Sequence, residues 1–355
     1  MKTRRKLLTM LLGLLVFPFS LSSQVFDNPY LFQKAEELYS AGQYHKARTL
    51  FEQCGDDALS RGYVVLCALK GSDLDVESLM VGYERDYPSS VMSSRIRLEN
   101  AFRLFDLEEY ALCAVELSKV DSRIIPAEAM SEYVFKCAYC QYMLQSDDAA
   151  LDFFTLLEAL DHSTYSAPGL YLSALIYYNR RDFPLAEQYF KRVVSDPRFK
   201  DLAEFYIVDC EFNQKNYEFA SKEGERLYQT APKERRERLS RIISESSLVL
   251  GDAARAREFY ESSSKQDMNR KDYFYAASVL YNVKDYKGAI ENYSRMGDRS
   301  DSLGQIANYN MANSYLRLRN QVAAMDAFRL AGEVDFDREI TEDALFEKVR
   351  QIFEY

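Results

Sequence analysis

Glycine and proline are scarce in this 355-residue chain, which contains 13 Gly and 8 Pro. An all-β fold needs such residues at its many tight turns, so their scarcity argues against that class. No stretch rich in Pro, Gly or Ser marks a linker between two domains. By contrast, 47% of the residues are apolar, with 27 Tyr and 22 Phe, which is enough material for a large helical core. The composition favours one long helical array over two ordinary globular domains.

Sequence patterns of catalysis and metal binding are also missing. The chain has no HExxH, no GxSxG, no Gly-rich phosphate loop and no metal-ligand spacing. Its two histidines are His45, which we expect to be exposed at the start of a helix, and His162, in a polar loop between Asp161 and Ser163. Such neighbours are no catalytic triad, because a triad is assembled in space around an oxyanion hole. We predict that the chain is not an enzyme and that it has no catalytic, cofactor-binding or metal-binding residues.

The N-terminal segment, residues 1–23, differs from the rest of the chain. It begins with four basic residues, Lys2, Arg4, Arg5 and Lys6. They precede an apolar run, Leu7–Leu21, which is shorter than the roughly 20 residues of a membrane-spanning helix. Because the run ends in the small residues Ser22 and Ser23, the segment is typical of a cleaved secretory signal peptide. The alternative is an uncleaved N-terminal anchor.

The charge of the remaining chain limits its partners. Without the four basic residues of the signal, 41 Lys and Arg stand against 55 Asp and Glu, a formal charge of −14. Nucleic acid and anionic lipid surfaces repel such a chain, so we expect neither as a partner, and no integral membrane segment after signal cleavage.

A pattern of paired small residues recurs along residues 24–355. In each copy two small or β-branched residues stand 12 positions apart, one on each of two predicted helices, as Ala174 and Ala186 do. Tyr or Phe often opens the second helix, and an aromatic residue often follows the second small residue by four, as Phe190 does. Small residues let two helices approach closely, and the aromatic rings fill the space beside them. Within the first copy Gly42 is expected to end the first helix, and Gly71 to mark the turn of the second.

The pattern predicts nine helical hairpins and a terminal helix. The predicted hairpins cover residues 28–57, 58–88, 94–125, 131–162, 165–198, 201–232, 237–268, 270–301 and 305–337, and the terminal helix covers 341–355. The paired small positions are Ala35/Ala47, Val64/Val76, Ala101/Cys113, Ala138/Ala150, Ala174/Ala186, Val208/Ala220, Ser244/Ala256, Ala277/Ala289 and Ala312/Ala324. Because the interval of 12 never changes, chance apolar spacing is a poor explanation.

These motifs resemble the tetratricopeptide repeat (TPR) family over nearly all of residues 28–340. The resemblance implies an all-α fold, a right-handed α-solenoid of about nine TPR hairpins plus a terminal helix. The chain departs from the family in having no Trp, so Leu31, Val134, Leu170 or Tyr273 stands where a bulky residue is usual. Its segments CALKGSDLD and AFRLAGEVDFDREITEDALF resemble the N-terminal part of long secreted TPR proteins of Bacteroidetes-type bacteria. That resemblance implies a periplasmic location in a Gram-negative cell envelope and a scaffold role.

Six cysteines in an exported chain raise the question of disulfides. On the repeat pattern Cys54 and Cys113 occupy small-residue positions of second helices, while the other four fall near core-facing positions of first helices. Cys137 and Cys140 form a CxxC inside a helix, where the helix N-terminus does not lower a thiol pKa. Buried structural thiols explain this distribution best, with a local disulfide, or redox or metal chemistry, as alternatives.

Aromatic residues on the first helices give the candidate binding groove. One row lies three residues before the first small residue, and another lies one to two turns later. The candidate groove residues are Phe32, Leu98, Phe135, Tyr171, Phe205, Phe274 and Tyr309 from the first row, with Tyr142, Tyr178 and Phe212 from the second. In resembling proteins this face lines a concave groove for extended peptides. Packing between helices is the alternative for each residue, and rings with a polar tip suit a wet binding surface.

Two further segments call for an explanation. The run KERRERLSR, Lys233–Arg241, is either a solvated helix face with interleaved Glu residues or a place where Arg238 and Arg241 meet an acidic partner. The terminal helix carries apolar residues, Phe346 and Val349 among them, where a terminal repeat normally presents a polar face. That helix either binds something or belongs to a longer array.

The sequence thus predicts a non-enzymatic TPR scaffold of the cell envelope that binds a protein or peptide partner on its concave face. A glycan- or peptidoglycan-binding protein is the first alternative, because exposed aromatic rings also stack on sugars. A cell-wall lyase is the second, although no segment outside the repeats is long enough for a catalytic domain.

Overall fold

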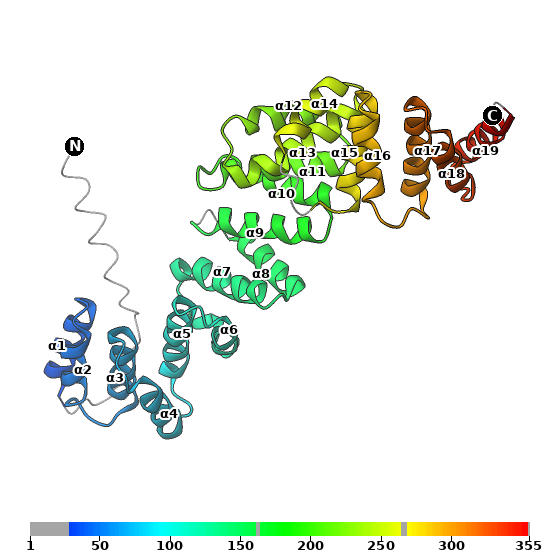
Figure 1. Cartoon of the computed structure of the whole chain (residues 1–355). Coiled ribbons are helices and arrows are strands. Elements are labelled where there is room, and N and C mark those ends of the chain that lie inside the picture. The colour runs from blue at the N-terminus through cyan, green and yellow to red at the C-terminus, as the bar shows by residue number, and fades with distance from the viewer. Residues whose placement is uncertain (1–27, 161–163, 264–267, 354–355) are drawn as a thin grey trace, which may run out of the picture. The chain divides into compact units, whose positions relative to one another are not determined.

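The computed structural model describes residues 28–160, 164–263 and 268–353, so the expected signal peptide and His162 lie outside the described residues. Within those ranges the chain forms nineteen α-helices, one short 3-10 helix and no strand, which confirms the all-α class (Figure 1). The chain divides into two compact units, one ending at Gly169 and one beginning at Leu170. The division falls inside α9 (Ser166–Asn179).

Each helix pairs with the next one along the chain to form hairpins. Unit 1 contains α1 (Pro29–Ser40), α2 (Tyr44–Phe51), α3 (Ala58–Gly71), α4 (Val76–Asp86), α5 (Val91–Asp106), α6 (Tyr110–Ser118), the 3-10 helix η1 (Ser122–Ile124), α7 (Ala127–Met143) and α8 (Asp147–Ala159). After α9, unit 2 contains α10 (Phe183–Val193), α11 (Lys200–Asn213), α12 (Tyr217–Tyr228), α13 (Lys233–Val249), α14 (Ala253–Ser262), α15 (Arg270–Asn282), α16 (Tyr286–Ser294), α17 (Ser302–Arg317), α18 (Gln321–Gly332) and α19 (Arg338–Phe353). The odd-numbered helices are called A helices here and the even-numbered ones B helices.

The paired small residues lie where A and B helices touch. All eighteen are buried, with Ser244 the most accessible at 5%. In two hairpins the side chain at one small position bonds the backbone at the other. The Cys113 thiol donates to the Ala101 carbonyl at 3.1 Å, and the Ser244 hydroxyl donates to the Ala256 carbonyl at 2.7 Å. Larger side chains would push the two backbones apart.

The turn between the A and B helices is the same in all nine hairpins. One residue has a positive φ, and the amide of the next residue donates to the carbonyl five positions back at 2.8–3.0 Å. This is the hydrogen bond of a Schellman motif, which ends a helix and satisfies one of its free carbonyls. The positive-φ residues are Gly42, Ser72, Glu108, Gln145, Arg181, Lys215, Gly251, Lys284 and Arg319.

Gly42 ends the first helix as expected, but Gly71 does not occupy the left-handed position of the second turn. Ser72 takes that position with φ 58°, and Gly71 is the last residue of α3. A Cβ on Gly71 would lie 3.1 Å from the His45 ring, so the absence of a side chain serves the close approach of α2.

Aromatic pairs clamp five of these turns. The ring one turn after the first small residue meets the ring that opens the B helix, at 5.5–6.0 Å and 67–76°. The pairs are Tyr39/Tyr44, Phe105/Tyr110, Tyr178/Phe183, Phe212/Tyr217 and Tyr281/Tyr286. Edge-to-face contacts of this kind stabilise by about 0.5–1.5 kcal/mol beyond their burial. They explain why an aromatic residue so often opens the second helix.

Neighbouring hairpins stack through the aromatic residue that follows the second small position. Phe51 of α2 lies flat against Tyr63 of α3 at 4.7 Å, and Phe190 of α10 lies against Tyr206 of α11 at 4.8 Å. The seventh hairpin departs from this pattern, because Phe259 is buried in its core whereas Tyr260 is only half-buried. Tyr260, which occupies the position where the pattern places the ring, packs instead against the core of the following hairpin.

The last helix begins earlier than the sequence indicated. α19 starts at Arg338 rather than Thr341, because the Asp337 carboxylate accepts hydrogen bonds from the amides of Glu339 and Ile340. Its attachment to α17 depends on the buried side chain of Gln305, which donates to Thr341 Oγ1 at 2.8 Å and accepts from the Asp337 amide at 2.8 Å. Leu345, Phe346 and Val349 of α19 are exposed, at 45–64%.

Candidate functional site

The first row of predicted groove residues packs largely within its own hairpins. Four of its rings meet the B-helix aromatic residue edge-to-face at 5.2–5.9 Å. The pairs are Phe32/Phe51, Tyr171/Phe190, Phe274/Tyr293 and Tyr309/Phe328. Leu98 packs against the buried core beside α5, α6 and α7, while Phe135 and Phe205 contact Tyr139 and Tyr206. Phe32 is buried and the other six are half-buried, so only part of each side chain faces solvent.

The second row has two functions in the fold. Tyr178 and Phe212 belong to the turn clamps, and Tyr142 contacts Tyr139 on the same helix at 6.3 Å. All three are half-buried. Tyr178 and Phe212 differ from Tyr142 in that they lie beside a group of charged side chains in unit 2.

This group, called the polar strip here, extends over four successive A helices of unit 2. It consists of Tyr178 on α9, Asp209 and Phe212 on α11, Arg238, Arg241 and Glu245 on α13, and Asp272 and Tyr275 on α15. These helices are consecutive first members of hairpins, so residues about one repeat apart in sequence come together. The strip is the candidate functional site of the described residues.

Asp209 is the centre of one half of the strip. It is 2% exposed, and Arg238 donates to both of its carboxylate oxygens, at 2.7 and 3.0 Å. The Tyr178 hydroxyl donates to Asp209 Oδ2 at 2.9 Å, and the Asn213 amide donates to Oδ1 at 2.9 Å. Burial and the neighbouring negative charge raise the pKa of Tyr178, so its hydroxyl remains a donor. The Arg238 guanidinium also lies 5.5 Å from the ring of Phe212.

The other half of the strip surrounds a hollow between α13, α14 and α15. Arg241 Nη1 lies 3.3 Å from Asp272 Oδ2, and Asp272 also accepts from the Asn269 amide as part of the N-terminal cap of α15. Glu245 lies one turn beyond Arg241 on α13 and lines the same hollow. Burial raises the pKa of Glu245 to about 8, although Arg238 and Arg241 oppose that shift.

The basic run Lys233–Arg241 therefore has a divided role. Lys233, Glu234 and Arg236 are exposed, as a solvated helix face requires. Arg238 and Arg241 do meet acidic groups, but these belong to the same chain, on α11 and α15. The signal that could have located these pairs is opposite charge on A helices at a separation of about one repeat, 29 residues for Asp209 and Arg238.

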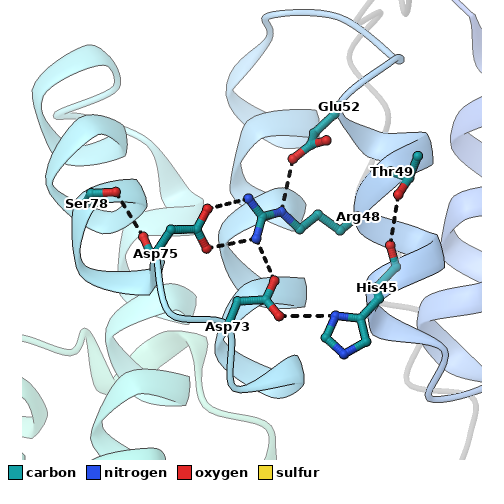
Figure 2. Close-up of polar contacts among 7 residues, drawn as sticks. All are labelled: His45, Arg48, Thr49, Glu52, Asp73, Asp75 and Ser78. Atoms are coloured by element: carbon teal, nitrogen blue, oxygen red, sulfur yellow. Dashed lines mark hydrogen bonds and ion pairs between the residues drawn. The ribbon is translucent and has the colours of Figure 1, made fainter.

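Unit 1 has a charge cluster of another kind, called the Arg48 cluster here (Figure 2). Arg48 of α2 donates to Asp75 through two nitrogens, at 2.6 and 2.9 Å, to Asp73 at 2.5 Å and to Glu52 at 3.0 Å. His45 Nδ1 lies 3.1 Å from Asp73, and its side chain is 74% exposed, as expected from the sequence. The cluster fastens the α3–α4 turn to α2, and every charged group in it has a partner.

The positions of the six cysteines in the structure test the expectations drawn from the sequence. All six thiols are buried and none is paired in a disulfide. Cys137 and Cys140 lie in the C-terminal half of α7, away from its N-terminus. Cys54 does not occupy a position on the second helix of its hairpin, because α2 ends at Phe51 and Cys54 lies in the turn that follows. Its thiol donates to the Leu50 carbonyl at 3.2 Å.

The described residues contain no cluster of three or more His, Cys, Asp or Glu side chains that could hold a metal ion. None of the helices formed by them combines the length and the hydrophobicity that a membrane span requires.

No protein family matches the sequence of the chain, and no curated protein is a significant relative. Among solved structures, the chain is similar to the TPR domain of P58(IPK), with 15% identity, coverage of 91% of this chain and 98% of that one, and a TM-score of 0.37. It is also similar to a tetratricopeptide repeat protein from Parabacteroides merdae, with 13% identity, coverage of 80% and 97%, and a TM-score of 0.38. The apo form of RapI has 10% identity, coverage of 85% and 96%, and a TM-score of 0.46. Similarity at this level identifies no partner.

Proposed function

We propose that the chain is an exported, non-enzymatic scaffold or adaptor of the bacterial cell envelope that binds a protein or peptide partner on the face formed by its A helices. The observation that carries the proposal is the polar strip of unit 2. Four consecutive A helices contribute charged and aromatic side chains to it, all at half-buried positions except the buried Asp209. Side chains held in this way keep their geometry before a partner arrives, so less conformational entropy is lost on binding.

The composition of the strip suits an extended peptide. Tyr178 and Tyr275 combine an apolar ring with a hydroxyl, and the charged groups of α13 lie between them. Aromatic and Arg side chains are the residues that contribute most at protein interfaces. The export part of the proposal is supported by the basic and apolar residues of the N-terminal segment. A periplasmic location and a partner in the cell envelope are parts of the same proposal.

Photo-crosslinking in cells tests the proposal. A benzophenone amino acid at position 212 keeps an aromatic ring beside the strip, and the same amino acid at Gln188, exposed on the B helix α10, is the matched control. We expect position 212, and not position 188, to yield adducts with a defined protein in the periplasmic fraction, identified by mass spectrometry. Equal adducts from both positions, no adduct at position 212, or recovery of the chain from the cytosol alone would contradict the proposal.

A sedimentation assay with purified peptidoglycan separates the glycan alternative. We expect the chain to remain in the supernatant at physiological salt. Co-sedimentation that survives in the presence of the crosslinked protein partner would favour glycan binding instead.

A further inference from the structure

The helix α19 packs on the preceding hairpin as earlier A helices of unit 2 do. In three of those helices the residues five positions before and two positions after the first small residue are 0% exposed, namely Ala203/Cys210, Leu239/Ser246 and Ala307/Ser314. In α19 Ala344 and Gln351 have the same spacing and are 0% and 3% exposed. Ala344 also belongs to the core that contains α18. This register makes Val349 the first small residue of α19 and places Phe346 three positions before it.

The side of α19 that corresponds to the B-helix contact is open. In each of the nine earlier A helices the first small residue is at most 5% exposed, because a B helix covers it. Val349 is 49% exposed. Phe346 is 64% exposed, whereas the ring at its position meets a B-helix ring in four hairpins. Leu345 beside it is 45% exposed. These three residues, called the α19 face here, form an unfilled position for an antiparallel helix among the described residues.

We propose that the α19 face binds the α19 face of a second copy of the chain, with the two helices antiparallel about a two-fold axis. A B helix runs antiparallel to the A helix that it covers, and a two-fold axis perpendicular to α19 supplies a helix in that direction. Phe346 then packs against the Phe346 of the other copy, with Leu345 and Val349 of each copy beside the two rings. The contact is self-complementary, so one surface is enough to form a closed dimer.

The charges at the ends of the face fit a second copy. Glu342 lies four residues before Phe346, and Arg350 lies four residues after it. In an antiparallel pair centred on Phe346, each Glu342 therefore lies opposite the Arg350 of the other copy. Their side chains are 65% and 46% exposed. Their contacts within one chain, with Arg338 at 2.8 Å and Glu347 at 2.9 Å, lie along the same helix, where exposed ion pairs contribute little. A second copy needs this symmetric placement of opposite charges, whereas a foreign helix does not.

The pairing goes beyond the proposed function and does not depend on it. The residues of the polar strip lie on α9, α11, α13 and α15, and the α19 face uses other residues. A dimer carries two polar strips. For a partner with two binding segments, the second segment then binds intramolecularly, which raises the apparent affinity.

Sedimentation equilibrium of the purified full chain tests the pairing. We expect a reversible monomer–dimer equilibrium with a dissociation constant on the order of 10 µM, because an interface of one helix pair is small. Phe346→Glu places a charge at the centre of the contact and should weaken the association about 100-fold. Phe336→Glu is the matched control, because Phe336 is 59% exposed in the segment before α19 and its replacement should change nothing. Circular dichroism checks that both variants fold.

Charge reversal tests the antiparallel arrangement. Glu342→Arg leaves like charges opposite each other in the dimer, and so does Arg350→Glu. Each variant alone should therefore associate roughly fivefold more weakly than the wild type. An equimolar mixture of the two variants pairs opposite charges again, and it should associate as the wild type does.

Four outcomes would count against the pairing. A wild-type chain that stays monomeric at every accessible concentration would overturn it. So would association that Phe346→Glu does not weaken, or that Phe336→Glu weakens to the same extent. A protein that copurifies with a monomeric wild type and is lost from Phe346→Glu would assign the α19 face to a foreign helix instead. A mixture of the two charge variants that associates no better than either alone would overturn the antiparallel arrangement.

Discussion

The Arg48 cluster of unit 1 and the polar strip of unit 2 are built from the same kinds of side chain but differ in how the charges are matched. In the Arg48 cluster one guanidinium holds three carboxylates, of which Glu52 and Asp75 are 42% and 46% exposed and Asp73 is 14% exposed. In the polar strip Arg238 pairs with Asp209, which is only 2% exposed, and Arg241 pairs with Asp272.

The two clusters differ in how their carboxylates meet water. Glu52 and Asp75 of the Arg48 cluster are 42% and 46% exposed, so water screens part of its surplus negative charge, and the cluster fastens a turn. In the strip Asp209 is removed from water and depends on its partners, and burial raises the pKa of Glu245.

The largest expected loss of stability comes from removing Arg238. Arg238→Met leaves the Asp209 carboxylate buried beside neutral donors only, and we expect a loss of about 3 kcal/mol of unfolding free energy. Arg48→Met leaves carboxylates that water reaches, so we expect a loss of about 1 kcal/mol. Urea unfolding followed by circular dichroism measures both. Equal losses would mean that the two clusters do not differ in desolvation.

Neutralising Asp209 as well provides the control for this comparison. In the double variant Asp209→Asn with Arg238→Met no ionised carboxylate remains at that position, and most of the lost stability should return. If the double variant is less stable than Arg238→Met, the loss comes from packing against Phe212 and not from the unpaired charge.

The next effect concerns Glu245 and has the opposite sign. Its pKa rises from 4.5 to about 8 on folding, so the wild type loses stability as the pH rises between those values. Glu245→Gln removes this term, and we expect a gain on the order of 4 kcal/mol at about pH 8 and about 1 kcal/mol at about pH 5. Urea unfolding at the two pH values measures it, with Glu234→Gln as control. A stability gain independent of pH would contradict the explanation.

Asp75 of the Arg48 cluster should show the reverse pH dependence. Hydrogen bonds from Arg48 lower its pKa below 3.8, so the stability it contributes is present above that value and is lost as the pH falls through the folded-state pKa. Asp75→Asn should therefore flatten the acid side of a melting-temperature profile without changing the alkaline side. A change above neutral pH in this variant would show that the two clusters are coupled.

The smallest expected effect comes from backbone strain in two hairpin turns, and it involves neither cluster. Arg181 has φ 62° in a hairpin turn and is exposed, so Arg181→Gly should relieve backbone strain and stabilise by about 0.5 kcal/mol. Gly251 has φ 84° in the corresponding turn, and Gly251→Ala should destabilise by about 1 kcal/mol. Thermal unfolding of both variants provides the measurement. The same sign for both would contradict the turn geometry.

Much of the fold follows from local sequence. The 12-residue interval between small residues predicted eighteen buried contact positions, and all are buried because close helix packing admits nothing larger there. Turn positions were harder to predict. Seven of the nine left-handed residues are not glycine, so composition does not reveal them, and the hydrogen bond that holds each one belongs to the folded hairpin. The start of α19 was missed because Asp337 acts as its cap only after the chain turns there.

The candidate site was less predictable than the fold. The sequence located Tyr178 and Phe212, and it offered an acidic partner for Arg238 and Arg241 as an alternative. It could not show that this partner is the chain itself, because Asp209 and Asp272 lie 29 and 31 residues away and meet them only through stacked hairpins. The sequence does not single out Glu245, because its distinguishing property is the lack of a partner among the described residues. That property depends on three-dimensional packing.

The burial of all six thiols bears on the proposed export, which would deliver the chain to an oxidising compartment. Burial raises the pKa of Cys67, Cys137 and Cys210 to about 12, so these three thiols stay protonated in the folded protein. Under the proposed export, a newly translocated chain would lack this protection until its hairpins close around the cysteines. Contacts between neighbouring helices are local in sequence, and folds with local contacts form quickly, which would shorten the time for which the thiols are accessible.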